Sequence, residues 1–142
     1  MASSRRFRVL RVPGRFAVCR LSPAEAIPSW ANGPGFVSIT RTADELSVVC
    51  DEAVVPRDTE CMRGYVAFRV EGTLAPDLVG VLVSLAEPLA DAGIPIFAIG
   101  THDTDYILVR EVDLERALGA LQHAGHEVDS GRSITFPANR VN

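Results

Sequence analysis

The chain has few sulfur groups and no arrangement of them that predicts a disulfide or zinc site. It contains three cysteines, Cys19, Cys50 and Cys61, and an odd number at wide spacing is not a disulfide framework. No C-x-x-C pair of the kind that holds zinc occurs. We therefore expect reduced, half-buried thiols in a reducing compartment, and no metal held by cysteine.

Long apolar runs are also missing. No stretch of about 18 apolar residues predicts a transmembrane helix. The first residues lack the apolar core of a secretory signal peptide. By elimination, the sequence predicts a cytoplasmic protein with no membrane partner.

Positive charge and aromatic residues are too sparse for a general nucleic-acid binder. The formal net charge is -4 and aromatic residues make up 6% of the chain, whereas nucleic-acid binding needs a basic surface and often stacking rings. The basic cluster near the N-terminus contains Arg5, Arg6, Arg8 and Arg11. Its simplest interpretation is a solvated strand face, so no nucleic-acid partner is expected.

The common catalytic motifs are absent from the sequence. It contains no P-loop, no G-x-G-x-x-G fingerprint and no G-x-S-x-G nucleophile elbow. His123 and His126 flank Gly125, where a helix is expected to stop, and cations suit that end of a helix. We expect both histidines to be surface groups. The sequence therefore predicts a protein that is not an enzyme and carries no cofactor.

The second half of the chain has the clearest pattern of strands and helices. In the segment 76–91, apolar side chains recur at helical spacing and predict one buried face, made of Leu78, Val81, Leu82, Leu85 and Leu89. Pro76 suits the first turn of this helix and Gly93 its end. Asp113 is expected to cap a second helix that stops at Gly125. The expected strands cover residues 64–71, 94–100, 105–110 and 126–129.

This order, β-α-β-β-α-β, is the split ferredoxin-like arrangement. It predicts an α+β fold in which two helices pack on one face of an antiparallel sheet. The opposite face would be left for another sheet, subunit or domain.

The first half repeats this pattern in a weaker form. Residues 36–50 align with 96–110 without gaps, and 7–12 align with 65–70, which indicates a duplication. Residues 16–22 are expected to add an extra strand, and 32–35 to form a loop. We therefore divide the chain into a first, degenerate unit (1–60), a second unit (61–129) and a C-terminal tail (130–142).

A polar turn at residues 101–105 leaves three interpretations open. Asp and Thr side chains readily bond to nearby backbone, so the cluster can be ordinary turn chemistry. His102, Asp103 and Asp105 are also a possible metal set, which would make the protein a metal-dependent enzyme, although a fourth ligand is missing from the sequence. The third interpretation is a ligand-binding turn that accepts hydrogen bonds from an ammonium group.

The start of the helix at 76–91 offers the opposite charge. Its free backbone N–H groups and partial positive charge suit a carboxylate. If this helix start and the turn at 101–105 meet, they are together complementary to an α-amino acid zwitterion. Gly80 has two interpretations: it allows a ligand to approach the backbone closely, or it allows tight packing of helix on sheet.

Three segments resemble ACT domains of the CASTOR-like, aspartokinase-type group: residues 88–118, 35–52 and 63–72. The first contains the pattern A-G-I, I-F-x-I-x-T and D-T-D-Y-I-L-V. The resemblance implies two ACT units in tandem that pair side by side and bind a small effector at their shared interface.

The resemblance also implies a set of ligand contacts, of which Asp105 is the first choice. Leu78 stands where the arginine-binding members have an acidic residue, which argues against arginine as the effector. The implied contacts are Thr59, Glu60, Ala75, Asp77, Leu78, Gly80, Thr101, His102, Asp103, Thr104 and Asp105.

The leading functional hypothesis is thus an amino-acid-sensing regulatory module. Its expected partners are an amino-acid effector, a second copy of the chain in a homodimer or larger homo-oligomer, and a regulated protein that the sequence does not identify. The alternatives are an ACT protein that only mediates assembly without a ligand, and the metal-dependent enzyme named above.

Overall fold

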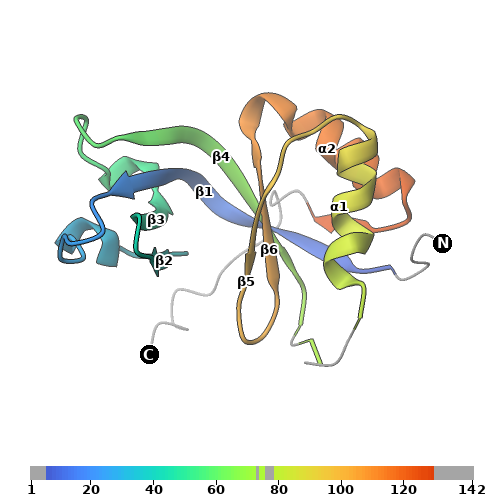
Figure 1. Cartoon of the computed structure of the whole chain (residues 1–142). Helices are drawn as coiled ribbons and strands as arrows, with labels where there is room; N and C mark the ends of the chain where they lie inside the picture. Colours follow the sequence, from blue (N-terminus) through green and yellow to red (C-terminus); the bar gives the residue numbers. More distant parts are fainter. Residues whose placement is uncertain (1–5, 73, 76–78, 130–142) are drawn as a thin grey trace.

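The computed structural model describes residues 6–72, 74–75 and 79–129. These residues form an α+β structure in which a strongly twisted sheet carries two helices on one face (Figure 1). The strands are β1 (Arg8–Leu21), β2 (Ser38–Arg41), β3 (Leu46–Asp51), β4 (Cys61–Val70), β5 (Phe97–Gly100), β6 (Asp105–Arg110) and β7 (Glu127–Asp129), and the helices are α1 (Val81–Asp91) and α2 (Leu114–His123). Three short 3-10 turns, η1 (Ser29–Asn32), η2 (Glu52–Val54) and η3 (Glu111–Asp113), lie between them.

The sheet is nearly symmetric about its two central strands. Its order is β2-β3-β1-β4-β6-β5, and neighbours along this path run antiparallel. The short strand β7 pairs in parallel with the start of β1. The hairpin of β2 and β3 therefore occupies one edge and the hairpin of β5 and β6 the other.

Strand β1 corrects the prediction of two separate strands at 7–12 and 16–22. It runs without interruption for 14 residues. Gly14 has a φ of +98°, and the register with β4 shifts between Val12 and Phe16. A bulge of this kind bends a strand without ending it. The first part of β1 pairs with β7 and the last part with β3, so one strand serves both halves of the sheet.

The two hairpins of the inferred duplication occupy equivalent positions in the sheet. The strand segment that pairs with the first hairpin, however, differs from the one that we predicted. Residues 17–21 of β1 pair with β3 as residues 65–69 of β4 pair with β6. The counterpart of the second half's first strand is therefore 17–21 and not 7–12. Residues 22–37, which precede β2, contain η1 where the second half has helix α1.

Helix α1 begins later than predicted. Its first residue is Val81, and Gly80, with a φ of +84°, is its N-cap instead of lying one turn inside. Pro76 and Leu78 lie outside the described residues. Val81, Leu85 and Leu89 are buried as expected, whereas Leu82 is 42% exposed and does not belong to the buried face.

The two helices end where the glycines predicted. Gly93 (φ +72°) follows α1 and Gly125 (φ +97°) follows α2. Asp113 is the N-cap residue of α2, but its side chain makes no capping bond. It pairs instead with the guanidinium groups of Arg110 and Arg116, at 2.9 and 3.2 Å.

His126 is buried, which contradicts the prediction of a surface group. Only 5% of its surface is exposed. Its Nδ1 accepts a hydrogen bond of 3.1 Å from the Phe7 N–H, so the proton of the neutral ring sits on Nε2, which lies 2.8 Å from the Ser84 carbonyl. His123, by contrast, is exposed as expected.

The main core lies between the sheet and the helices. Apolar side chains of alternate strand positions face α1 and α2, as period-two patterning requires. Its buried members include Val66, Phe68, Val70, Leu85, Leu89, Ile107, Val109, Ala117 and Leu121. Neither helix of the described chain has the length and apolar character needed to cross a lipid bilayer.

The opposite face of the sheet is covered in part by the first half of the same chain. Phe36, from the segment before β2, stacks on Tyr106 of β6 with ring centroids 4.3 Å apart. It also meets Phe16 edge to face at 5.8 Å. Part of this face is therefore buried by the chain itself, whereas Tyr65 and Phe97 on the same face remain half-buried.

Candidate functional site

The turn between β5 and β6 is held by a closed set of hydrogen bonds. The Thr101 N–H and hydroxyl both donate to the Thr104 carbonyl at 2.9 Å, and the Thr104 N–H donates to the Thr101 hydroxyl oxygen at 3.2 Å. Such mutual side-chain and backbone bonds fix the shape of a turn. The interpretation as turn chemistry is thus correct for Thr101 and Thr104.

Two further bonds tie this turn to the chain that leaves β4. The hydroxyl of Thr104, a residue only 5% exposed, donates to the Val70 carbonyl at 2.8 Å. The Leu74 N–H donates to the Asp103 carbonyl at 2.7 Å. The turn and the segment leading toward α1 are therefore one connected unit at the lower end of the molecule in Figure 1.

The start of α1 has no side-chain cap among the described residues. Gly80 is its N-cap and has no side chain to accept from the first turn. In any α-helix the first backbone N–H groups lack a partner within the helix, and the helix dipole places partial positive charge there. Gly80 has a left-handed φ of +84°, a conformation that residues other than glycine rarely adopt. Within the part of the chain that the structure describes, the first N–H groups of α1 are thus left for a ligand or water to bind.

The turn and the helix start meet at one cavity of about 290 Å³. This volume is close to the lower end of the range for small-molecule sites. The described lining combines an acidic turn with apolar side chains, and none of its members is an arginine. Its members are Leu74, Ala75, Gly80, Val81, Leu82, Thr101, His102, Asp103, Thr104 and Asp105.

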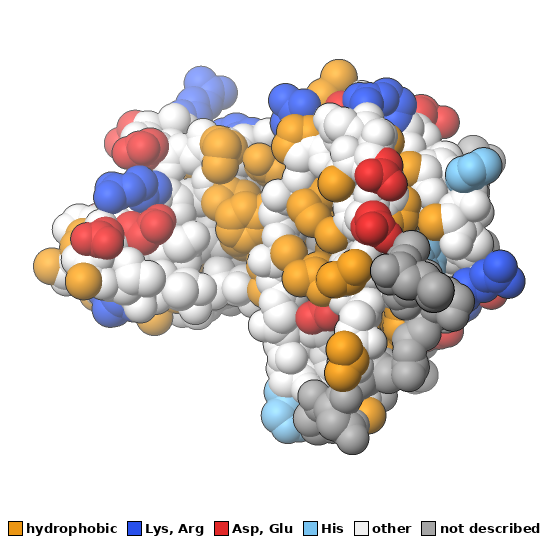
Figure 2. All heavy atoms as spheres, turned by 45° about the vertical axis from the view of Figure 1, so that its right-hand side comes forward, with side chains coloured by type: hydrophobic (Ala, Val, Ile, Leu, Met, Phe, Trp, Pro, Cys, Tyr) orange, Lys and Arg blue, Asp and Glu red, His pale blue; other side chains and the backbone are white. Residues whose placement is uncertain are grey.

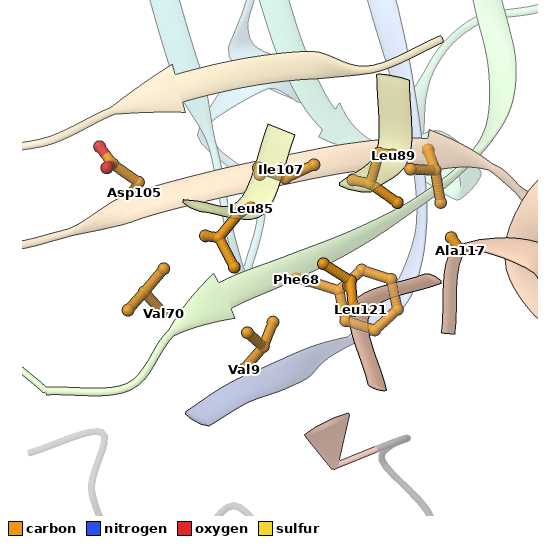
Figure 3. A pocket seen from close by; sticks show the side chains of 10 residues that line it. Val9, Phe68, Val70, Leu85, Leu89, Asp105, Ile107, Ala117 and Leu121 are labelled. Atoms are coloured by element: carbon orange, nitrogen blue, oxygen red, sulfur yellow. The ribbon is translucent and has the colours of Figure 1, made fainter. Parts of the chain in front are cut away.

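Asp105 stands between the core and this cavity. It is paired across the hairpin with Gly100, where an added Cβ would come within 3.4 Å of the Asp105 Oδ1. Figure 3 shows its carboxylate directed away from the apolar side chains around Val70 and Leu85. The core space that those side chains line has a volume of only about 10 Å³, room for at most one water. No hydrogen bond or ion pair of the Asp105 carboxylate occurs within the described part of the chain.

Seven of the predicted contact residues line the cavity: Ala75, Gly80 and residues 101–105. Asp77 and Leu78 lie outside the described residues. Thr59 and Glu60 do not belong to this cavity. Glu60 lines a separate groove beside Cys61, and the Thr59 N–H closes a turn onto the Pro56 carbonyl.

Three further residues line the cavity that the sequence does not predict as ligand contacts: Leu74, Val81 and Leu82. Leu74 and Val81 adjoin predicted residues, so adjacency was the available signal. Helical spacing predicts Leu82 on the buried face of α1, whereas in the structure it is partly exposed and lines the cavity.

The metal interpretation of the turn finds no support in the geometry. His102 Nδ1 lies 2.9 Å from Asp103 Oδ1, and their side chains are 95% and 64% exposed. Across residues 6–72, 74–75 and 79–129, no three His, Cys, Asp or Glu side chains are placed to hold a metal ion.

Comparison with known proteins assigns the chain to a family. A family model described as an ACT domain matches residues 60–123, and a separate model of an N-terminal domain matches residues 14–58. The crystal structure of protein Atu0741 from Agobacterium tumefaciens is 41% identical, with a TM-score of 0.86 over 94% of this chain and 99% of that one. The chain belongs to the same family as Atu0741, and its second half is an ACT domain.

More distant structures share the fold of this ACT-domain protein. A protein of unknown function from Vibrio cholerae is 19% identical, with a TM-score of 0.67 over 83% of this chain and 89% of that one. The aspartate kinase of Clostridium acetobutylicum is 12% identical, with a TM-score of 0.60 over 82% of this chain and 34% of the kinase. At these identities the likeness concerns the fold alone. No curated protein matches the ACT-domain chain.

Proposed function

We propose that this ACT-domain protein binds a free α-amino acid in the cavity between the β5–β6 turn and the start of α1, and acts as a regulatory module instead of an enzyme. The observation that carries the proposal is that the Asp105 carboxylate and an uncapped helix N-terminus line the same 290 Å³ cavity. The turn that carries Asp105 is fixed to the end of β4 by the Thr104 hydroxyl.

The two groups are complementary to the two poles of a zwitterion. The N–H groups of the first turn of α1 can donate to a carboxylate, which the helix dipole also favours. The Asp105 carboxylate can accept from an ammonium group, and charge-assisted bonds of this type are the stronger ones. A ligand with only one of the two charges would leave one half of the cavity unmatched.

The rest of the lining limits the side chain of the ligand. Leu74, Ala75 and Leu82 offer apolar surface, and the nearby carboxylate of Asp103 adds a second negative charge. An acidic side chain would meet these carboxylates, and the described lining offers no arginine to balance it. We therefore expect a neutral, predominantly apolar amino acid. Aspartokinase III of Escherichia coli, which shares the fold, has been crystallised in complex with aspartate and ADP, which supports amino acids as the ligand class.

A thermal-shift screen of the twenty free amino acids tests the proposal. A ligand at 100 times its Kd should raise the free energy of unfolding by about 2.7 kcal/mol. The best ligand is then compared with its amide, which lacks the carboxylate, and with its deaminated acid, which lacks the ammonium group. Both analogues should lose most of the shift, because each removes one pole.

Asp105→Asn identifies the site. The loss of a charge-assisted bond should weaken binding by about 10- to 100-fold in isothermal titration calorimetry. Asp44→Asn is the matched control, since Asp44 is an exposed residue in the turn of the other hairpin and the charge change is the same. Full retention of binding in Asp105→Asn would contradict the site, and the absence of any amino-acid shift would contradict the function.

Exposed apolar side chains on α1 and just before it, one of which (Leu82) lines the cavity, favour assembly as a companion function. Val79, Leu82 and Val83 are 82%, 42% and 54% exposed. Figure 2 shows hydrophobic side chains spread over this part of the surface, down to the tip that carries a histidine. Exposed apolar groups that gather in a patch are typical of an interaction surface. We propose a homodimer or larger homo-oligomer that covers them, so that the ligand lies at an interface and its binding is passed to a regulated partner.

Sedimentation velocity tests the assembly. Val83→Glu should shift the distribution toward monomer, whereas Glu87→Gln, one turn further along α1, should leave it unchanged. A wild-type chain that stays monomeric at high concentration would favour a ligand site complete within one copy.

We further propose that the first half, residues 1–60, is a degenerate ACT unit beside the second at 61–129. The support is the equivalent placement of the two hairpins on opposite edges of the sheet. The loss of the helices in the first half would explain why only the second hairpin turn faces a helix start.

A further inference from the structure

The three cysteines are far apart in the sequence but lie together on one face of the sheet. Cys50 is on β3, Cys19 on β1 and Cys61 on β4, three strands that are neighbours in the sheet. All three pack in one cluster. They therefore form a short row of thiols, with Cys19 in the middle.

Cys19 and Cys61 occupy directly opposite positions on β1 and β4. The Arg20 N–H donates to the Glu60 carbonyl at 2.9 Å, a bond that flanks the pair and makes it a non-hydrogen-bonded pair of the antiparallel ladder. At such positions the Cα atoms are about 4.5 Å apart and the side chains lie close together. This spacing lies within the range that a disulfide spans, about 4.4–6.8 Å.

The two members of the pair differ in their access to solvent. Cys19 is only 1% exposed, whereas Cys61 is partly exposed. Burial raises the pKa of Cys19 to about 12, with further contributions from Cys50 and Cys61. Because Cys61 is the more exposed of the two, a reagent from solvent reaches Cys61 first.

We propose that Cys61 and Cys19 are a peroxide-reactive dithiol that closes into a cross-strand disulfide. A peroxide oxidises the Cys61 thiol to a sulfenic acid, and one water leaves when the peroxide is hydrogen peroxide. The Cys19 sulfur then attacks this sulfur, the S–S bond forms, and the sulfenic hydroxyl leaves with the Cys19 proton as a second water. Two electrons pass from the two sulfurs to the peroxide, and a dithiol reductant reverses the step.

Trypsin places each cysteine in a peptide of its own, which makes the assignment direct. All 14 basic residues of the chain are arginines, so cleavage after arginine yields the peptides 16–20 with Cys19, 42–57 with Cys50 and 58–63 with Cys61. The full-length protein is treated with hydrogen peroxide, denatured in iodoacetamide and digested without reductant. We expect peptides 16–20 and 58–63 to be linked with the loss of two hydrogens, and 42–57 to be alkylated.

Variants separate this pair from its alternatives. Cys61→Ser, at the partly exposed position, should abolish the link, as should Cys19→Ala. Cys50→Ala should retain it. A link between peptide 42–57 and either partner in the wild type, a link between two copies of 58–63, or sulfinic acid on Cys61 without any link would each overturn the proposal.

Discussion

The Nε2 atom of His126 lies 2.8 Å from the main-chain carbonyl of Ser84, and this carbonyl is the one that Pro88 leaves without a helical partner. In α1 the Ser84 carbonyl would normally accept from the N–H four residues later, and proline has none. The imidazole supplies the missing donor, while its other nitrogen accepts from the Phe7 N–H. The His126 side chain thus links three parts of the chain: Phe7, which precedes β1, helix α1, and the segment that follows α2.

Replacement of His126 by leucine should lower the free energy of unfolding by about 2–4 kcal/mol, since it removes both bonds and leaves buried polar groups unpaired. Urea denaturation measures the change. His123→Leu is the control, because His123 is exposed and should stay within about 0.5 kcal/mol of wild type. Equal effects of the two substitutions would show that the buried bonds contribute nothing.

A double-mutant cycle tests whether Pro88 is the reason that the Ser84 carbonyl needs the His126 side chain. Alanine at position 88 restores a backbone N–H that can reach the Ser84 carbonyl. The cost of His126→Leu should therefore be smaller in a Pro88→Ala background, by about 1 kcal/mol. A coupling energy of zero would show that the freed carbonyl does not depend on the imidazole.

The hydroxyl of Thr104 is the second long-range link that we expect to matter. Thr104→Val keeps the shape of the side chain but removes the donor to the Val70 carbonyl, which should cost about 1–3 kcal/mol of stability. Thr104→Ser retains the hydroxyl and should recover most of it. If the cavity binds an amino acid, Thr104→Val should also weaken that binding, because the turn loses its attachment to β4.

The strands and the turn were predictable because their signals are local. Alternation in β4 and β6 places Val66 and Val109 toward the helices and Tyr65 and Leu108 toward the other face. The composition of the turn at 101–105 likewise indicates its hydrogen bonds. The continuity of β1 was missed because Pro13 and Gly14 look like a break, whereas pairing with β4 on one side carries the strand across the bulge.

The rest depends on contacts between distant residues. The burial of His126 requires a carbonyl freed by Pro88 in another element. Thr59 and Glu60 came from the family resemblance, and the topology places Glu60 in another groove. Helical periodicity continues through Leu82, so it does not reveal that a left-handed Gly80 delays the start of α1. Where a helix begins is set by backbone geometry that periodicity does not report.

Two glycines should respond to alanine with opposite signs. Gly80 has a φ of +84° and Gly119 lies inside α2, and at either position an added Cβ would have no atom of the described residues within 4 Å. Gly80→Ala should cost about 1–2 kcal/mol from backbone strain alone. Gly119→Ala should add about 0.5–1 kcal/mol, because alanine favours the helix. Thermal denaturation of both variants checks the pair, and stabilisation by Gly80→Ala would show that this residue does not need the left-handed conformation.

Stability should fall at alkaline pH because of the thiol row. Desolvation by burial raises the pKa of Cys19 from 9.0 to about 12 in the folded chain. The folded state therefore keeps a proton that the unfolded state has released, and the free energy of unfolding decreases between about pH 9 and pH 12, at up to about 1.4 kcal/mol per pH unit for one proton. Below pH 9 this contribution is complete. Cys19→Ala should flatten the decline when urea denaturation is measured at several pH values under reducing conditions, while Cys61→Ser, which leaves the buried thiol in place, should retain most of it. An identical slope in wild type and Cys19→Ala would assign the loss to other groups.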